Sequence, residues 1–118
     1  MYDDIPTRNS DGPSNEEPRV RDNPGANRFE VLLGDVVAGF SEYRKHADRI
    51  VFTHTEVDPA FGGKGIGSRL AAGALDDVRA RGLKVTPICP FIAAYIRRHP
   101  AYADLVVDRH DSRRRSAT

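Results

Sequence analysis

The sequence predicts a mixed α/β fold, of the α+β class, in a single domain. Three segments with the alternating pattern of β-strands come first, and a helix, a fourth strand and a second helix follow them. The chain has 118 residues, which suits one hydrophobic core and leaves too few for a second. We therefore expect an antiparallel meander followed by a helix–strand–helix unit.

The two ends of the sequence lack the apolar residues that a core needs. Residues 1–26 combine prolines, glycines and charges, a composition that cannot offset the entropy of ordering. Residues 110–118 contain a run of arginines without a core-forming pattern. The sequence therefore predicts a disordered tail over 1–26, a folded domain over 27–109 and a flexible basic tail over 110–118. Both tails are expected to be dispensable for folding.

The first three strands are predicted at residues 28–33, 36–46 and 49–57. Apolar residues alternate in "RFEVLL", and Gly34-Asp35 offers a tight turn into the next strand. β-Branched and aromatic residues are frequent in "RIVFTHTEV", which follows a second short turn. Segments joined by such short turns pair as antiparallel neighbours, so they form the meander.

The first helix is predicted to follow a glycine-rich segment and to end at Gly82. Its apolar residues recur every three or four positions, as on one face of an amphipathic helix. Gly82 would supply the left-handed residue that commonly ends a helix. The predicted apolar stripe consists of Ile66, Leu70, Ala71, Ala74, Leu75 and Val78.

The remaining strand and helix are predicted between Gly82 and Pro100. Residues 83–88, "LKVTPI", have a strand pattern. A second helix is expected to start at Pro90, because the fixed φ angle of proline suits the first helical position, and to stop before Pro100. Cys89 then occupies the N-cap position.

The segment "DPAFGGKGIGSRL", residues 58–70, concentrates glycines between a strand end and a helix start. Such a loop exposes N–H groups, and the helix N-terminus favours negative charge, so a phosphate or pyrophosphate site is expected there. A P-loop is excluded because Lys64 is followed by Gly65 instead of Ser or Thr. The dinucleotide fingerprint is excluded because its third glycine is replaced by Leu70.

The stretch "VDPAFGGKGIGSRL" resembles the acetyl-CoA loop of the GCN5-related N-acetyltransferases. Gly65 and Gly67 match the two small positions of that loop, and Gly62 stands where the family carries Gln or Arg. The longer string "FTHTEVDPAFGGKGIG…LKVTPICPFIAAYIRRHPAY" is similar to the small YjdJ-type members of this superfamily.

This resemblance implies a compact acetyltransferase-like fold in which the strands 49–57 and 83–88 splay apart around acetyl-CoA. The backbone of the first strand would line the pantetheine arm, and the loop would bind the pyrophosphate. The implied cofactor-binding residues are Thr55, Glu56, Val57, Gly62, Gly63, Lys64, Gly65, Ile66, Gly67, Ser68 and Arg69.

Acetyl transfer to an amine needs a base, because a free lysine-like amine has a pKa near ~10.4. Strict alternation along "RIVFTHTEV" would place His54 and Glu56 on the same face as Phe52, and this pair is the predicted general base. Cys89 is either a nucleophile favoured by the helix dipole or a small buried residue. The resemblance implies a further candidate, Tyr95, as the acid that protonates the CoA thiolate.

Composition narrows the classes of function. The net charge of +1 gives no case for nucleic acid, and no apolar run approaches the ~18 residues of a membrane span. A single cysteine forms no internal disulfide and no multi-thiolate zinc site, so no metal is expected. We expect a cytoplasmic protein without a membrane or nucleic-acid partner.

The function expected from the sequence is acetyl-CoA-dependent N-acetyl transfer to a small-molecule or peptide amine. The alternative is a CoA-binding interaction module without turnover, because the folded body lacks the early elements that shape the acceptor pocket in this superfamily. A second copy of the chain or a partner protein would then complete the acceptor site. A nucleotide-binding phosphate loop is disfavoured by the missing Ser or Thr after Lys64.

Overall fold

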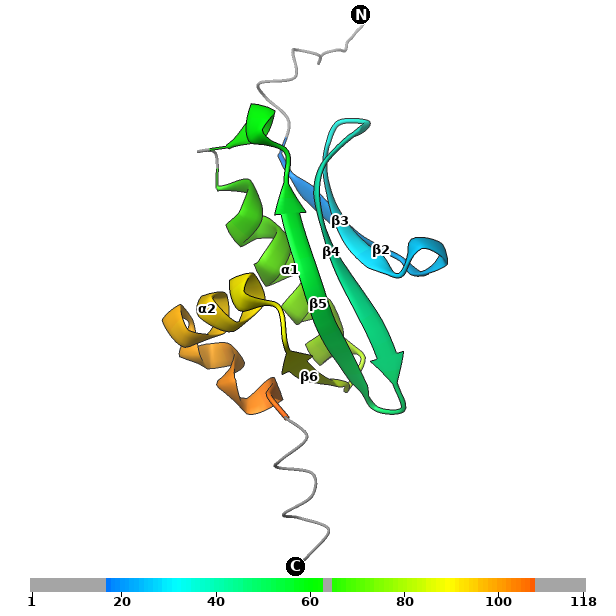
Figure 1. Ribbon diagram of the computed structural model, residues 1–118, viewed down its shortest axis with the longest axis vertical. Helices are drawn as coiled ribbons and strands as arrows, with labels where there is room; N and C mark the ends of the chain where they lie inside the picture. Colours follow the sequence, from blue (N-terminus) through cyan, green and yellow to red (C-terminus); the bar gives the residue numbers. More distant parts are fainter. Residues whose placement is uncertain (1–16, 63–64, 108–118) are drawn as a thin grey trace, which may run out of the picture.

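A five-stranded sheet with two helices on one side forms the body of the protein, in a computed structural model that describes residues 17–62 and 65–107 (Figure 1). The order of the strands in the sheet follows their order in the chain. The strands are β2 (Arg19–Asn23), β3 (Arg28–Leu33), β4 (Val36–His46), β5 (Arg49–Val57) and β6 (Lys84–Pro87), the helices are α1 (Ile66–Ala80) and α2 (Pro90–Arg98), and three 3-10 turns are η3 (Pro24–Ala26), η4 (Pro59–Phe61) and η5 (Pro100–Leu105).

The predicted topology is confirmed. Strands β3, β4 and β5 are antiparallel neighbours, and β6 lies parallel to β5 after the crossover through α1. Strand β6 is slightly shorter than the predicted 83–88, whereas α2 has the predicted bounds with Cys89 at its N-cap. Gly82 follows α1 with a φ angle of +73°, as expected for a residue that ends a helix.

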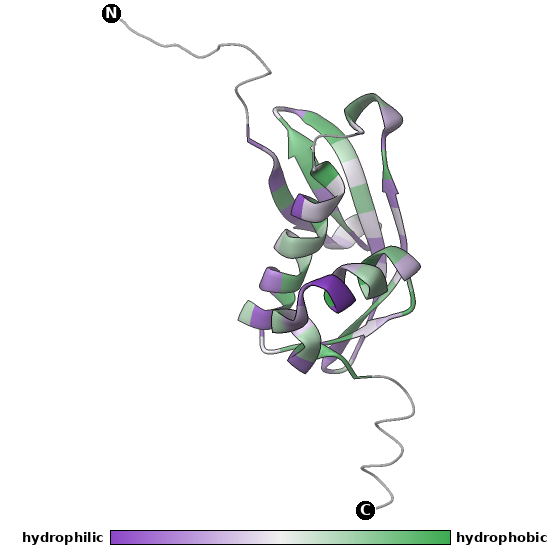
Figure 2. Cartoon of the chain, turned by 90° about the vertical axis from the view of Figure 1, so that its left-hand side faces the viewer, coloured by the Kyte–Doolittle hydropathy of each residue, from purple (hydrophilic) through white to green (hydrophobic). Residues whose placement is uncertain are grey.

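The core lies between the sheet and the helices. All six residues of the predicted stripe of α1 are buried, and they pack on aromatic residues of the strands such as Phe29 and Phe52. Helix α2 contributes Ile92 and Ile96 to the same cluster. In Figure 2, where the helices face the viewer, hydrophilic residues lie on their outer turns and hydrophobic stretches lie in the strands behind. This burial is the main stabilising contribution to the fold.

The prediction of a disordered tail over 1–26 is wrong for residues 19–26, which form β2 and η3. Every residue of β2 pairs with β3. The pattern was missed because β2 offers only Val20 to the core, while its other side chains make polar contacts: the Asp22 carboxylate accepts hydrogen bonds from Tyr43 Oη and from Arg81, each at 2.6 Å. The folded domain therefore begins before residue 27. Residues 1–16 and the predicted tail 110–118 lie outside the described residues.

A buried carboxylate joins β2 to β3 on the face of the sheet opposite the helices. Glu30 is only 1% exposed and accepts hydrogen bonds from Arg28 Nε (2.8 Å), Arg21 Nε (2.9 Å) and Asn23 Nδ2 (3.1 Å). Burial raises the pKa of Glu30, but these three donors outweigh burial together, so the pKa lies below its ordinary value of 4.5. Two of the three donors come from β2, which explains why a polar edge strand is ordered.

We predict that a chain starting at residue 27 is much less stable than the full chain. Removing β2 exposes Val20's packing partners and leaves Glu30 without Arg21 and Asn23, so the free energy of unfolding should fall by about 3 kcal/mol or more. Thermal unfolding followed by circular dichroism measures the difference. Equal melting temperatures for the two chains would contradict this prediction and would mean that residues 19–26 are a dispensable tail.

We also predict that Glu30→Gln flattens the acid limb of the stability profile. Because the pKa of Glu30 is depressed in the folded state, its contribution is complete above pH 4.5 and is lost as the pH falls through the folded-state pKa. At pH 7 the variant should lose about 1–3 kcal/mol, and at low pH it should approach the wild type. Urea unfolding at several pH values tests this, and a constant difference across the range would contradict it.

Candidate cofactor and active site

The predicted splay between β5 and β6 is confirmed. The two strands pair only from Arg49–Lys84 to Phe52–Pro87, and the last contact is the Cys89 N–H donating to Phe52 O at 2.9 Å. Proline has no N–H to continue a ladder, and Pro87 is followed at once by the turn into α2. Strand β5 continues to Val57 without a strand partner on that side among the described residues. We call this unpaired edge of β5, which faces α2, the gap; side chains such as Cys89, which contacts Thr55, lie in it.

Backbone groups of β5 face this gap. The Asp58 N–H donates to Ala38 O of β4, and alternation along a strand then directs Glu56 to β4 as well. Thr55 and Val57 therefore present their N–H and C=O groups to the gap, where no strand of the described chain pairs with them. Thr55, Glu56 and Val57 are predicted to contact the cofactor through their backbones. The backbone groups of Thr55 and Val57 point away from β4 as this role requires, whereas those of Glu56 point toward β4.

The start of α1 lies at the mouth of the gap, and its glycines have two separate causes. Gly65 is the N-cap with a φ angle of +71°, in the left-handed region that favours glycine. Gly67 lies under α2: a Cβ there would sit 2.8 Å from Cζ of Phe91 and 3.5 Å from Cγ2 of Val57. Glycine at 67 thus lets α1, α2 and the end of β5 meet closely.

The first turn of α1 has N–H groups available for an anion. Gly65 provides no side-chain cap, so within the described chain the first N–H groups of the helix, at residues 66–68, have no capping side chain. Ile66 is buried, so only its backbone can contribute, whereas Ser68 is exposed. This arrangement suits a phosphate or pyrophosphate.

The other predicted loop residues are placed less favourably or lie outside the described residues. Arg69 is already engaged, because its Nη2 donates to Pro18 O at 3.2 Å and to Glu17 at 3.4 Å. Gly62 ends η4 with an ordinary φ angle of −63°. Gly63 and Lys64 are not among the described residues.

A β-bulge in β5 changes which side chains share a face. Glu42 pairs with His54 but Tyr43 pairs with Phe52, so Thr53 is an extra residue in β5. The prediction that His54 and Glu56 share the face of Phe52 is therefore wrong. After the bulge, Thr55 continues the helix-covered face.

His54 and Glu56 lie together on the opposite, open face of the sheet. His54 Nε2 is 2.7 Å from Glu56 Oε2, and the two side chains are 51% and 61% exposed. The ring of Phe40, from β4, lies beside His54 at 6.3 Å between centroids. The predicted pair is thus in hydrogen-bond contact and open to a substrate, as a general base requires.

Cys89 lies on the helix-covered side of the gap. It is 2% exposed, and its Sγ is 3.2 Å from Thr55 Oγ1, to which it donates. Thr55 Oγ1 is in turn 2.8 Å from Oγ of the buried Ser41. The thiol makes no capping bond to α2. Sequence reasoning missed this chain of polar groups because Ser41 gives no signal of its own.

Tyr95 is not brought to the other candidates. Its ring stacks on His99 at 4.0 Å and lies 6.1 Å from Tyr102, near the end of α2. Burial, followed by the charge of Asp76, raises the pKa of the Tyr95 phenol above its ordinary value of 10.0. Cys89 lies roughly 9 Å away along the helix axis. The proposed acid role of Tyr95 stays a prediction, and its contacts are those of a packing residue.

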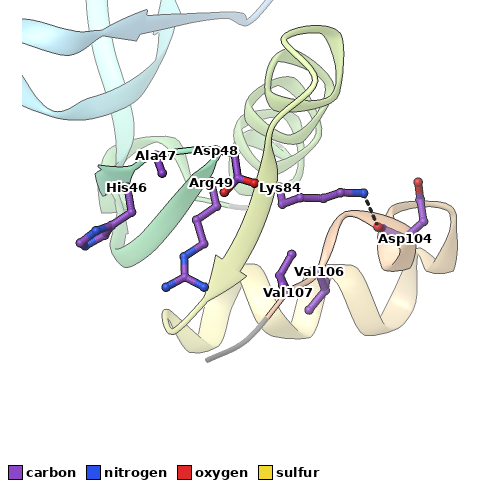
Figure 3. Close-up of a pocket in the computed structure, with 8 residues that line it drawn as sticks. All are labelled: His46, Ala47, Asp48, Arg49, Lys84, Asp104, Val106 and Val107. Carbon is purple, nitrogen blue, oxygen red and sulfur yellow. Dashed lines mark hydrogen bonds between the residues drawn. The ribbon is translucent and has the colours of Figure 1, made fainter. Parts of the chain in front are cut away.

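Two clefts lie at opposite ends of β5. One, of about 670 Å³, is lined at the start of β5 and β6, and Figure 3 shows its charged side chains pointing apart: His46 turns away, Arg49 lies between, and Lys84 reaches the backbone oxygen of Asp104. The other, of about 390 Å³, lies on the open face beside Glu56. The second cleft shares Glu56 and Val57 with the end of β5, whereas the first lies at the opposite end of that strand.

Neither a metal centre nor a membrane span is found in the described part of the chain. Within residues 17–62 and 65–107, no three His, Cys, Asp or Glu side chains gather closely enough to hold a metal ion. No helix described by the structure has the length and apolar character needed to cross a membrane.

Comparison with known proteins agrees with the geometry. The family model of the GCN5-related N-acetyl-transferases matches residues 28–105. A GCN5-like protein of Staphylococcus aureus, assigned as an N-acetyltransferase and solved by NMR in solution, is 22% identical with a TM-score of 0.59; the match covers 76% of this chain and 88% of that one. That likeness establishes the fold, and no protein of curated function matches the sequence. Because the family match spans 78 of the 118 residues, the chain belongs to the GCN5-related N-acetyltransferases and is an acyltransferase.

Proposed function

We propose that the protein transfers an acetyl group from acetyl-CoA to the amine of a small molecule or peptide. The observation that carries this proposal is the gap where β5 leaves β6. The unpaired strand backbone and the uncapped start of α1 border it, and the His54–Glu56 pair lies on the same strand, on the open face of the sheet. The narrower kinship with YjdJ-type proteins stays a prediction.

The residues around the gap fit CoA by their chemistry. The N–H groups of residues 66–68 suit the pyrophosphate, because a helix N-terminus favours negative charge. The N–H and C=O groups of Thr55 and Val57 suit the amides of the pantetheine arm, which would add to β5 as an extended strand does. The ring of Phe91, against Gly67, offers an apolar surface at the same place.

The chain's own part in the chemistry is to take a proton and to position the amine. The amine nitrogen, as the free base, bonds to the acetyl carbon of the thioester as the carbon–sulfur bond breaks; CoA leaves as the thiolate and takes a proton from solvent. Glu56, hydrogen-bonded to His54, accepts the proton that the amine loses. An exposed carboxylate–imidazole pair supports direct attack by the amine.

A relay through Cys89 is the second mechanism. It would need the thiol to leave its hydrogen bond with Thr55 and to reach the acetyl group from a position that is 2% exposed. That burial favours the direct mechanism. We further propose that a second copy of the chain or a partner protein covers the open face when the acceptor is a peptide.

We predict that Ser68→Asp weakens CoA binding without weakening the fold. Ser68 is exposed in the first turn of α1, where the helix dipole stabilises the negative charge of an aspartate, so the fold should tolerate the change. The same charge repels a pyrophosphate bound at this helix N-terminus. At about 5 Å and an effective dielectric of 20, the repulsion is on the order of 3 kcal/mol before screening by salt, so affinity measured by calorimetry should fall by roughly tenfold or more.

The matched control for this experiment is Ser68→Asn, which has nearly the same shape as Asp and no charge. The asparagine variant should bind CoA like the wild type. Equal affinities for the two variants would place the pyrophosphate elsewhere, and so would tighter binding of ATP than of CoA.

We predict that replacing both members of the pair, His54→Ala with Glu56→Gln, slows acetyl transfer by roughly 10² to 10⁴ while CoA affinity is unchanged. Cys89→Ala should then retain turnover and lose only packing energy. Steady-state kinetics and mass spectrometry after mixing with acetyl-CoA measure both effects. A stoichiometric acetyl adduct on Cys89, discharged at the rate of turnover, would establish the relay instead; CoA binding without any turnover would favour the interaction module.

A further inference from the structure

We propose that the acceptor carries a carboxylate as well as the reacting amine, and that it binds in the groove on the open face of the sheet between Arg28 and Glu56. This inference rests on the proposed acetyl transfer. It adds the chemical class of the acceptor, an ω-amino acid or a peptide segment with the same two groups, and the residue that selects it.

The strand register places the groups of this site in two rows across the open face. One row runs Glu30, Phe40 and Glu56, each the direct cross-strand partner of the next. The neighbouring row runs Arg28, Glu42 and His54 in the same way. Arg28 on β3 and Glu56 on β5 therefore lie in neighbouring rows, and both Phe40 and Glu42 of β4 lie between the two strands.

Arg28 is held in a fixed position and keeps donors to spare. Its Nε donates to Glu30 at 2.8 Å, and its Cζ lies 4.5 Å from the ring centroid of Phe40. Among the residues that the structure describes, no acceptor lies within hydrogen-bond distance of its two terminal nitrogens. Glu30 and Phe40 thus orient a guanidinium whose outer edge can bind a carboxylate.

The groove of about 390 Å³ connects this guanidinium to the base. Its lining includes Arg28 of β3, Phe40 and the preceding residues of β4, and Glu56 and Asp58 at the end of β5. Asp58 Oδ1 caps η4 by accepting the Ala60 N–H, whereas Glu56 lies beside Phe40 and His54 on the open face, so we assign the ammonium group to the Glu56 carboxylate. Phe40 forms the surface on which the carbon chain of the acceptor lies.

The charges and the spacing define the acceptor. An ammonium at Glu56 and a carboxylate at Arg28 must be roughly one to two strand spacings apart, about 5–10 Å. An α-amino acid is too short for this span, whereas a chain of several methylene groups fits it. A simple alkylamine satisfies Glu56 and Phe40 but leaves the terminal nitrogens of Arg28 unused.

The test compares 6-aminohexanoate with hexylamine, which has the same carbon chain without the carboxylate, as acceptors for the full-length protein. We expect kcat/KM to be at least about tenfold higher for 6-aminohexanoate, the worth of one charge-assisted bidentate contact. In Arg28→Lys this preference should fall to within about threefold, because an ammonium cannot make the parallel two-point contact of a guanidinium edge with the substrate carboxylate while it also donates to Glu30.

The control variant is Arg44→Lys, at an exposed arginine of β4 that does not line the groove; it should keep the full preference. Equal rates for the two acceptors in the wild type would overturn the inference while leaving acetyl transfer in place, and so would an unchanged preference in Arg28→Lys. If neither amine is acetylated, calorimetry with acetyl-CoA distinguishes two outcomes. Binding of acetyl-CoA would contradict only the proposed acceptor class, whereas absence of binding would contradict acetyl transfer itself.

Discussion

The early end of the pairing between β5 and β6 is the constraint on which the rest of this structure depends. Four residues of each strand are paired. Pro87 has no N–H to continue the ladder, and the last hydrogen bond between the two segments runs from the Cys89 N–H to Phe52 O. Had the pairing continued, the backbone of Thr55 and Val57 would be satisfied within the sheet. The gap instead leaves these groups beside the N-terminus of α1, so that a site for an extended, anionic ligand results from the point where one strand stops.

The bulge at Thr53 adds the second half of the arrangement. It turns Thr55 toward Cys89 and the helices and directs His54 and Glu56 to the open face, which no helix in the described part of the chain covers (Figure 1). Strand β5 therefore presents the groups that suit a cofactor on its unpaired edge and the groups that suit an acceptor, His54 and Glu56, on the open face of the sheet. Arg28, fixed by the buried carboxylate of Glu30, extends the acceptor side across the sheet.

Local patterns predicted the elements well where side chains alternate or recur without interruption. The stripe of α1, the turn at Gly34-Asp35, and Cys89 before Pro90 follow such rules, and the structure agrees with them. Two features did not follow. Strand β2 is ordered by ion pairs of Arg21 with Glu30 and of Asp22 with Arg81, and these partners lie outside the strand's own sequence. The bulge at Thr53 depends on cross-strand register, so strict alternation assigned His54 and Glu56 to the wrong face.

The measurement that tests the central claim most directly is an NMR titration of the ¹⁵N-labelled protein with CoA. The account predicts that the largest amide shifts fall on the first turn of α1 and on Thr55 and Val57, with smaller effects on Phe91 and Cys89. Shifts concentrated instead around Arg49 and Lys84, in the cleft at the other end of β5, would contradict it, because the gap between β5 and α2 would then have no part in binding the ligand.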